Sequence, residues 1–66
     1  MKAVSVDLPE EAFSALSCSP QEMARELKLA AAIHWYSRGI ISQERAATIA
    51  GLDRTDFLLA LARVGE

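Results

Sequence analysis

The sequence predicts a mainly α-helical single domain over residues 1–66, in which a short N-terminal strand is followed by about four helices. Three observations predict this fold class. The chain contains twelve alanines and only three glycines, a composition typical of helices. Residues that cap helices precede helix-forming segments at Ser19, Ser42 and Asp53. Apolar and polar residues alternate for a long stretch only near the N-terminus, so that only residues 2–8 are predicted to be a strand.

The size and charge of the chain exclude several classes of protein. Seven Lys and Arg against nine Asp and Glu give a net charge of -2, which disfavours nucleic-acid binding by bulk charge. One cysteine and one histidine provide neither a disulfide framework nor a metal-ligand set, so no metal or other cofactor is predicted. The sequence has no apolar run long enough for a membrane span and no signal-peptide core, which predicts a cytoplasmic protein.

The alternating segment, residues 2–8, predicts a strand with one apolar side. Val4, Val6 and Leu8 share that side. No second strand is predicted in the chain, and unpaired strand backbone favours pairing with an equivalent strand of another chain. A domain this small is also marginally stable alone. We therefore expect a homodimer or higher oligomer, with Val4 and Val6 at the contact.

Residues 9–39 are predicted to be a helical dimerisation region. Pro9 begins a short helix that continues to about Leu16. The segment Ser19-Pro20-Gln21-Glu22 is a capping box that starts a second helix, residues 20–38, and Gly39 ends it.

The helix predicted at 20–38 has two apolar faces. One face serves the chain's own core, and in so small a protein the other is expected to meet another subunit. From the second face we assign Leu29, Ile33 and Tyr36 to dimerisation. The first face consists of Met23, Leu27, Ala31, His34 and Trp35, and the second of Leu29, Ala32, Ile33 and Tyr36.

Residues 42–64 are predicted to form a unit like a helix-turn-helix. Ser42 caps a helix over residues 43–50, Gly51 permits a tight turn, and Asp53 caps a last helix that continues to about Arg63. The buried side of the last helix is expected to consist of Phe57, Ala60, Leu61 and Val64.

Taken together, five short motifs resemble the small prokaryotic "uncharacterised protein family 0175". Their order and spacing cover almost the whole chain. Many members of that family are encoded beside a PIN-domain nuclease, so the resemblance implies an antitoxin role. The strand followed by Leu8-Pro9-Glu10-Glu11 also looks like the start of ribbon-helix-helix antitoxins. The sequence departs from its relatives at Asp53, where Ser or Thr is usual, and at His34-Trp35. The motifs are residues 6–11, 24–27, 36–42, 46–54 and 57–58.

Two functions follow as hypotheses. The first is an antitoxin-like protein that binds and restrains a partner protein, such as a PIN-domain nuclease, through the apolar face formed by Leu58, Leu59 and Ala62. The alternative is a small transcriptional regulator that contacts DNA through Arg45, Arg54 and Thr55. Aspartates and leucines at the start of the last helix disfavour base reading, and we expect weak DNA binding.

Catalysis is not predicted. His34 lies among apolar residues of the first face, where a core or interface histidine is expected rather than a general base. Cys18 precedes a helix start, but no histidine stands at a recognisable spacing from it, and a small inert residue is expected. The carboxylates of Glu22 and Glu26 are predicted to be solvated surface rather than a metal site.

Overall fold

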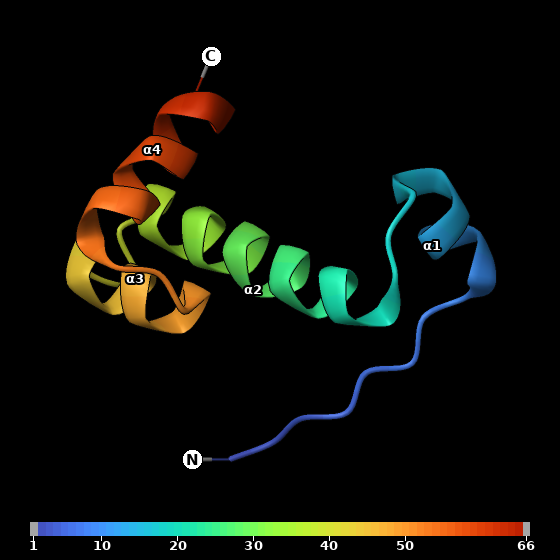
Figure 1. Cartoon of the computed structure of the whole chain (residues 1–66). Coiled ribbons are helices and arrows are strands. Elements are labelled where there is room, and N and C mark those ends of the chain that lie inside the picture. The colour runs from blue at the N-terminus through green and yellow to red at the C-terminus, as the bar shows by residue number, and fades with distance from the viewer. Residues whose placement is uncertain (1, 66) are drawn as a thin grey trace.

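The computed structural model describes residues 2–65, and these contain four helices (Figure 1). They are α1 (Glu10–Leu16), α2 (Pro20–Ser37), α3 (Gln43–Ala50) and α4 (Arg54–Val64). The mainly α-helical fold class and the order of the four helices are confirmed. None of these four helices is both long enough and apolar enough to cross a membrane.

The helices begin where their capping residues predict. At the start of α2, the Glu22 backbone N–H donates to Ser19 Oγ over 3.2 Å, and the Ser19 N–H donates to Glu22 Oε1 over 2.9 Å. The Arg45 N–H likewise donates to Ser42 Oγ at α3, over 3.2 Å. At α4 the Asp56 N–H donates to Asp53 Oδ1 over 2.8 Å. These bonds pair N–H groups that have no acceptor within the helix, and so they fix each starting residue.

Three of the helices end at left-handed residues. Gly39 and Gly51 both have φ near 74°, so the turns after α2 and α3 use the residue type that adopts this conformation at least cost. At the end of α1 the left-handed residue is Ser17, with φ near 53°. No turn signal in the sequence predicted that residue.

The core lies where α2, α3 and α4 meet. Phe57 of α4 is fully buried, and its ring meets Tyr36 of α2 edge to face with centroids 6.0 Å apart. Small side chains on α3 allow its backbone to approach the neighbouring helices closely. The buried cluster consists of Ala32, Ala46, Ala47, Ala50 and Phe57.

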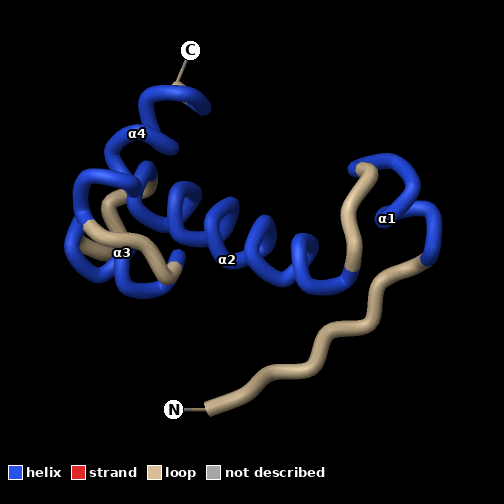
Figure 2. The backbone as a smooth tube through the Cα atoms, viewed as in Figure 1, coloured by secondary structure: helices blue, strands red, loops and turns tan. Residues whose placement is uncertain are grey.

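The N-terminal part of the chain stands away from this core. Figures 1 and 2 show α1 at the far end of α2 from α3 and α4, with the N-terminal segment running back beside α2. No residue of α1 is buried. The radius of gyration is 12.5 Å, whereas a compact domain of this length has one of about 11 Å.

Residues 2–8, predicted as a strand, are extended but contain no strand. A strand is defined by hydrogen bonds to a neighbouring strand, and the rest of the described chain, residues 9–65, is helix and connecting turns. Within the described residues the backbone of this segment makes no hydrogen bond to other backbone. We call residues 2–8 the N-terminal arm.

Candidate functional site

The first candidate site is an exposed apolar strip on α4. It consists of Leu58, Leu59 and Ala62, which we call the α4 surface. Leu58 is 45% exposed and Leu59 is 58% exposed, although both leucines lie on a helix whose opposite side buries Phe57 completely. The prediction that the local core leaves this face uncovered is confirmed.

The buried side of α4 is shorter than the sequence predicts. Phe57 is buried and Leu61 packs against the core, but Val64 is 64% exposed. Figure 1 shows the C-terminal end of α4 directed away from α2 and α3, which leaves its last turn uncovered.

The second candidate site is a groove between the N-terminal arm and α2. Val4, Val6 and Leu8 of the arm face the first apolar face of α2, where Leu27 is 42% exposed and Trp35 is 40% exposed. We call this cavity, of about 710 Å³, the α2 groove. Its lining also includes Lys2 and Lys28, and no carboxylate stands among the described residues that line it.

The two faces of α2 therefore have different roles from those we expected. Leu29, Ile33 and Tyr36 pack against the buried cluster, so the second face serves the chain's own core. Sequence reasoning had placed the dimer contact on that second face, and the structure instead leaves Leu27 and Trp35 of the first face exposed, although Met23 of that face is buried. Val4 is 84% exposed and Val6 is 62% exposed, and their contact with a second chain stays a prediction.

The three residues predicted to contact DNA are all on the surface. Arg45 lies in α3, and Arg54 and Thr55 are the first two residues of α4. Asp53 and Asp56 are exposed beside Arg54, so the start of α4 carries more negative charge than positive. This balance gives the surface little attraction for phosphates.

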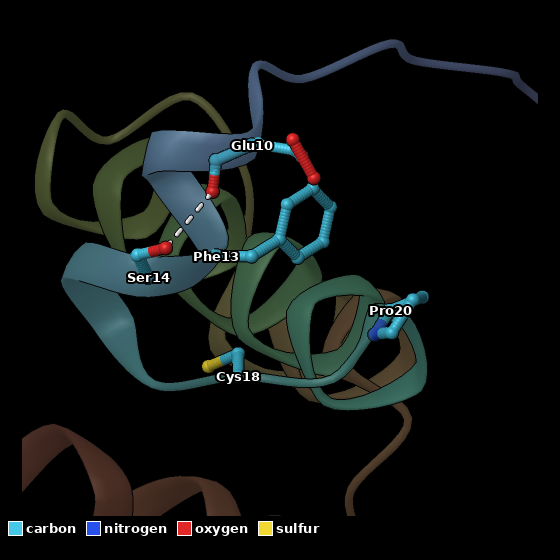
Figure 3. Close-up of a pocket in the computed structure, with 5 residues that line it drawn as sticks. All are labelled: Glu10, Phe13, Ser14, Cys18 and Pro20. Carbon is cyan, nitrogen blue, oxygen red and sulfur yellow. Dashed lines mark hydrogen bonds between the residues drawn. The ribbon is translucent and has the colours of Figure 1, made fainter.

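The residues considered for catalysis do not gather into one site. His34 is exposed in the last turn of α2 rather than packed in the core. Cys18 lies in a pocket between α1 and the start of α2 (Figure 3). Its thiol is 3.4 Å from the carbonyl oxygen of Leu16. Within residues 2–65, no three His, Cys, Asp or Glu side chains are placed to hold a metal ion.

The helix cap at the start of α2 changes the pKa of Glu22. Its pKa lies below the usual value of 4.5, first because its carboxylate accepts the Ser19 backbone N–H and then because it bonds the Ser19 side chain. These bonds favour the charged form. They belong to the helix cap, which gives Glu22 a structural role.

Sequence reasoning missed the α2 groove as a single feature. Both of its walls were visible, one as the alternation in residues 2–8 and the other as the first face of α2. The apolar pattern does not indicate that the chain reverses direction between the arm and α2, which brings the arm alongside α2.

Comparisons with known proteins identify the family. Residues 1–66 match the Uncharacterised protein family (UPF0175). A UPF0175 protein of Aeropyrum pernix is 50% identical over 42 residues, which make up 64% of this chain and 53% of that relative. A second UPF0175 protein of that organism is 36% identical over 64 residues, 97% of this chain and 67% of the relative.

The chain thus spans between about half and two thirds of the length of these two relatives. No solved structure is significantly similar to it. The family match extends over every motif on which the resemblance was based, and the chain belongs to the Uncharacterised protein family (UPF0175).

Proposed function

We propose that the chain is a non-enzymatic, antitoxin-like protein that binds and restrains a partner protein through the α4 surface. The observation that carries this proposal is the exposure of Leu58 and Leu59, at 45% and 58%, on a helix anchored by the fully buried Phe57. A rigid helix that presents adjacent apolar residues to solvent is a common way of docking into a partner's groove. Burying those two side chains in a partner removes their apolar area from water, which favours binding.

The partner in this proposal is a PIN-domain nuclease, the class implied by the family resemblance. The chain also acts as an oligomer, because the N-terminal arm has extended backbone and apolar side chains with no partner strand in residues 9–65.

The α4 surface is tested with Leu59→Glu. A charge placed at the centre of an apolar interface costs several kcal/mol, so we expect binding to weaken by at least about 100-fold. The measurement is co-purification of the tagged chain with a PIN-domain nuclease encoded beside its gene, followed by titration calorimetry and an RNA-cleavage assay.

The matched control is Ala30→Glu, which adds the same charge at an exposed position of α2 that lines neither candidate site. The control should bind the nuclease and suppress its cleavage as the unmodified chain does. Equal binding by Leu59→Glu and the unmodified chain contradicts the proposal.

DNA binding is the second candidate function, and the α3–turn–α4 unit favours it. α3 and α4 pack together across a three-residue turn, with Arg45 and Arg54 exposed. Two arginine contacts provide only a shallow electrostatic contribution, so binding to random duplex should vanish by roughly 0.15 M salt. Fluorescence anisotropy with the chain's own promoter fragment tests this function, and tight, salt-resistant binding would place regulation ahead of partner binding.

A further inference from the structure

The chain exposes more surface than a compact monomer does. Its accessible surface is 5507 Å². A compact monomer of 7.2 kDa exposes roughly 4,100 Å², so the excess is about 1,400 Å². Obligate homodimers bury roughly 1,000–2,500 Å² per chain. The excess therefore falls within the range of area that one chain contributes to a stable dimer.

Part of this exposed surface is apolar and lies at the α2 groove and α1. The groove has an apolar wall from the arm and another from α2, and Val4, Val6, Leu27 and Trp35 are all at least 40% exposed within it. α1 has seven residues and buries none of them. A helix this short is not stable in water without tertiary contacts, so α1 also needs a covering surface.

We propose that the α2 groove is the contact surface for a second copy of this chain, whose N-terminal arm pairs with this one as an antiparallel ribbon. The inference rests on the oligomeric part of the proposed function and is independent of partner binding by α4. In the ribbon, the two apolar arm faces form one layer that closes over the first faces of both α2 helices. The two-fold axis makes the contact self-complementary.

One register of the ribbon pairs more residues of the described arm than its neighbours do. Residues opposite each other in an antiparallel pair lie on the same face, so the side of the arm that carries Val4, Val6 and Leu8 must pair with the same side of the second arm. Centring the two-fold axis on Ser5 pairs all of residues 2–8, with Val4 opposite Val6 of the second copy. Shifting the register by two residues moves the axis to Val6 and shortens the paired segment. A second shift of this kind moves the axis to Asp7 and places that carboxylate opposite the same residue of the second copy, which is unfavourable.

Charge supports a second copy as the occupant of the groove. The groove is lined by Lys2 and Lys28 without a carboxylate among its described residues. α1 begins with Glu10 and Glu11 and contains no basic residue. In the register centred on Ser5, Lys2 lies opposite Leu8 of the second copy. Glu10 and Glu11 of that copy come shortly after Leu8 in its chain, so the acidic start of its α1 lies near Lys2.

The register is tested by cross-linking in a Cys18→Ser background, which removes the native thiol. Ser5→Cys places two cysteines directly opposite each other, with their Cα atoms about 5 Å apart. This separation lies within the range of roughly 4.4–6.8 Å that is typical of disulfides. Ala3→Cys is the matched control on the same outward side. Its two copies lie about 14 Å apart along the ribbon, too far to bond. We expect mild oxidation to convert most of the Ser5→Cys chain, and little of the Ala3→Cys chain, into a covalent dimer.

The surface is tested separately by mass. The unmodified chain should have twice the 7.2 kDa monomer mass in light scattering at micromolar concentration. Leu27→Glu should reduce this mass to that of the monomer, while circular dichroism shows the helices retained because Leu27 is exposed in the single chain. Leu59→Glu, on the α4 surface, should remain dimeric.

Three results overturn the inference: a monomeric unmodified chain, a dimer that survives Leu27→Glu, or equal cross-linking at positions 3 and 5. Retained nuclease binding by Leu59→Glu with the dimer intact contradicts only partner binding by the α4 surface, so the two proposals can fail independently.

Discussion

At the scale of single residues, the turn between α3 and α4 depends on the backbone of Gly51. Its φ and ψ are 74° and 26°. A Cβ at this position would have Lys28 Nζ as its nearest neighbour, at 3.8 Å, which is an ordinary contact. Gly51→Val therefore meets a conformational cost rather than a clash, and we expect the free energy of unfolding to fall by about 1–3 kcal/mol. Urea unfolding followed by circular dichroism measures this change.

Gly51→Asn is the control for that interpretation. Asparagine adopts left-handed backbone more readily than a β-branched residue, so its loss of stability should be smaller. An unchanged unfolding midpoint for Gly51→Val would show that the turn does not require a left-handed residue.

Glu22 makes the start of α2 sensitive to pH. Its pKa is lowered in the folded chain, chiefly by the bond from the Ser19 N–H. A depressed pKa contributes stability above the unfolded value of 4.5, and this contribution is lost as the pH falls through the lower folded value. We expect the melting temperature of Glu22→Gln to lie below that of the unmodified chain at pH 7, with the difference shrinking as the pH falls below 4.5.

Glu26→Gln, one turn further along α2, removes the same charge without touching the cap and serves as the control. A Glu22→Gln difference that stays constant through the acidic range would contradict the role assigned to the Glu22 carboxylate.

Much of this residue-scale structure could be predicted because its causes are local. The caps at Ser19, Ser42 and Asp53 each depend on a side chain reaching a backbone N–H three residues away. Ser17 could not be predicted as left-handed, since serine has no marked preference for that conformation and the end of α1 is set by where the chain must turn.

At the scale of elements, Phe57 holds α4 against α2. The ring is fully buried and meets Tyr36 edge to face at 6.0 Å. Phe57→Ala removes buried apolar area and leaves a cavity, so we expect a loss of about 3–5 kcal/mol, enough to unfold much of so small a domain. Thermal unfolding followed by circular dichroism is the measurement.

Leu58→Ala, at the neighbouring position of α4, is the comparison. Leu58 is 45% exposed, so its truncation should cost much less than that of Phe57. Similar losses for the two variants would contradict the assignment of the buried and exposed sides of α4.

Element positions were predictable to within a residue or two, but the partner of each apolar face was not. Periodicity showed that α2 has two apolar faces, and both exist. Which face meets α3 depends on the direction in which residues 38–41 carry the chain, and that direction is a property of turn geometry rather than of apolar spacing. The dimer contact was assigned to Leu29, Ile33 and Tyr36 for lack of this information.

At the scale of the whole molecule, the fold is divided into a packed end and an open end. The residues of the buried cluster all come from α2, α3 and α4, while no residue of α1 is buried and the N-terminal arm has no partner strand in the described chain. The small size of the chain predicted this need for further contacts. The shape of the open surface was not predictable, because it depends on how far α1 stands from the core.

A dimer that closes this open end links folding to assembly, which makes the melting temperature depend on concentration. Each tenfold rise in chain concentration favours the dimer over unfolded monomers by about 1.4 kcal/mol. Between 1 and 100 μM, approximate working limits, we expect the melting temperature to rise by several degrees. Differential scanning fluorimetry over this range measures the shift.

Leu27→Glu provides the contrast, because it places a charge in the α2 groove without entering the core of the single chain. Its melting temperature should be lower than that of the unmodified chain at high concentration and constant across the range, as for a folding monomer. A melting temperature of the unmodified chain that is equally constant would mean that three helices around Phe57 are stable alone, with the open end exposed in solution.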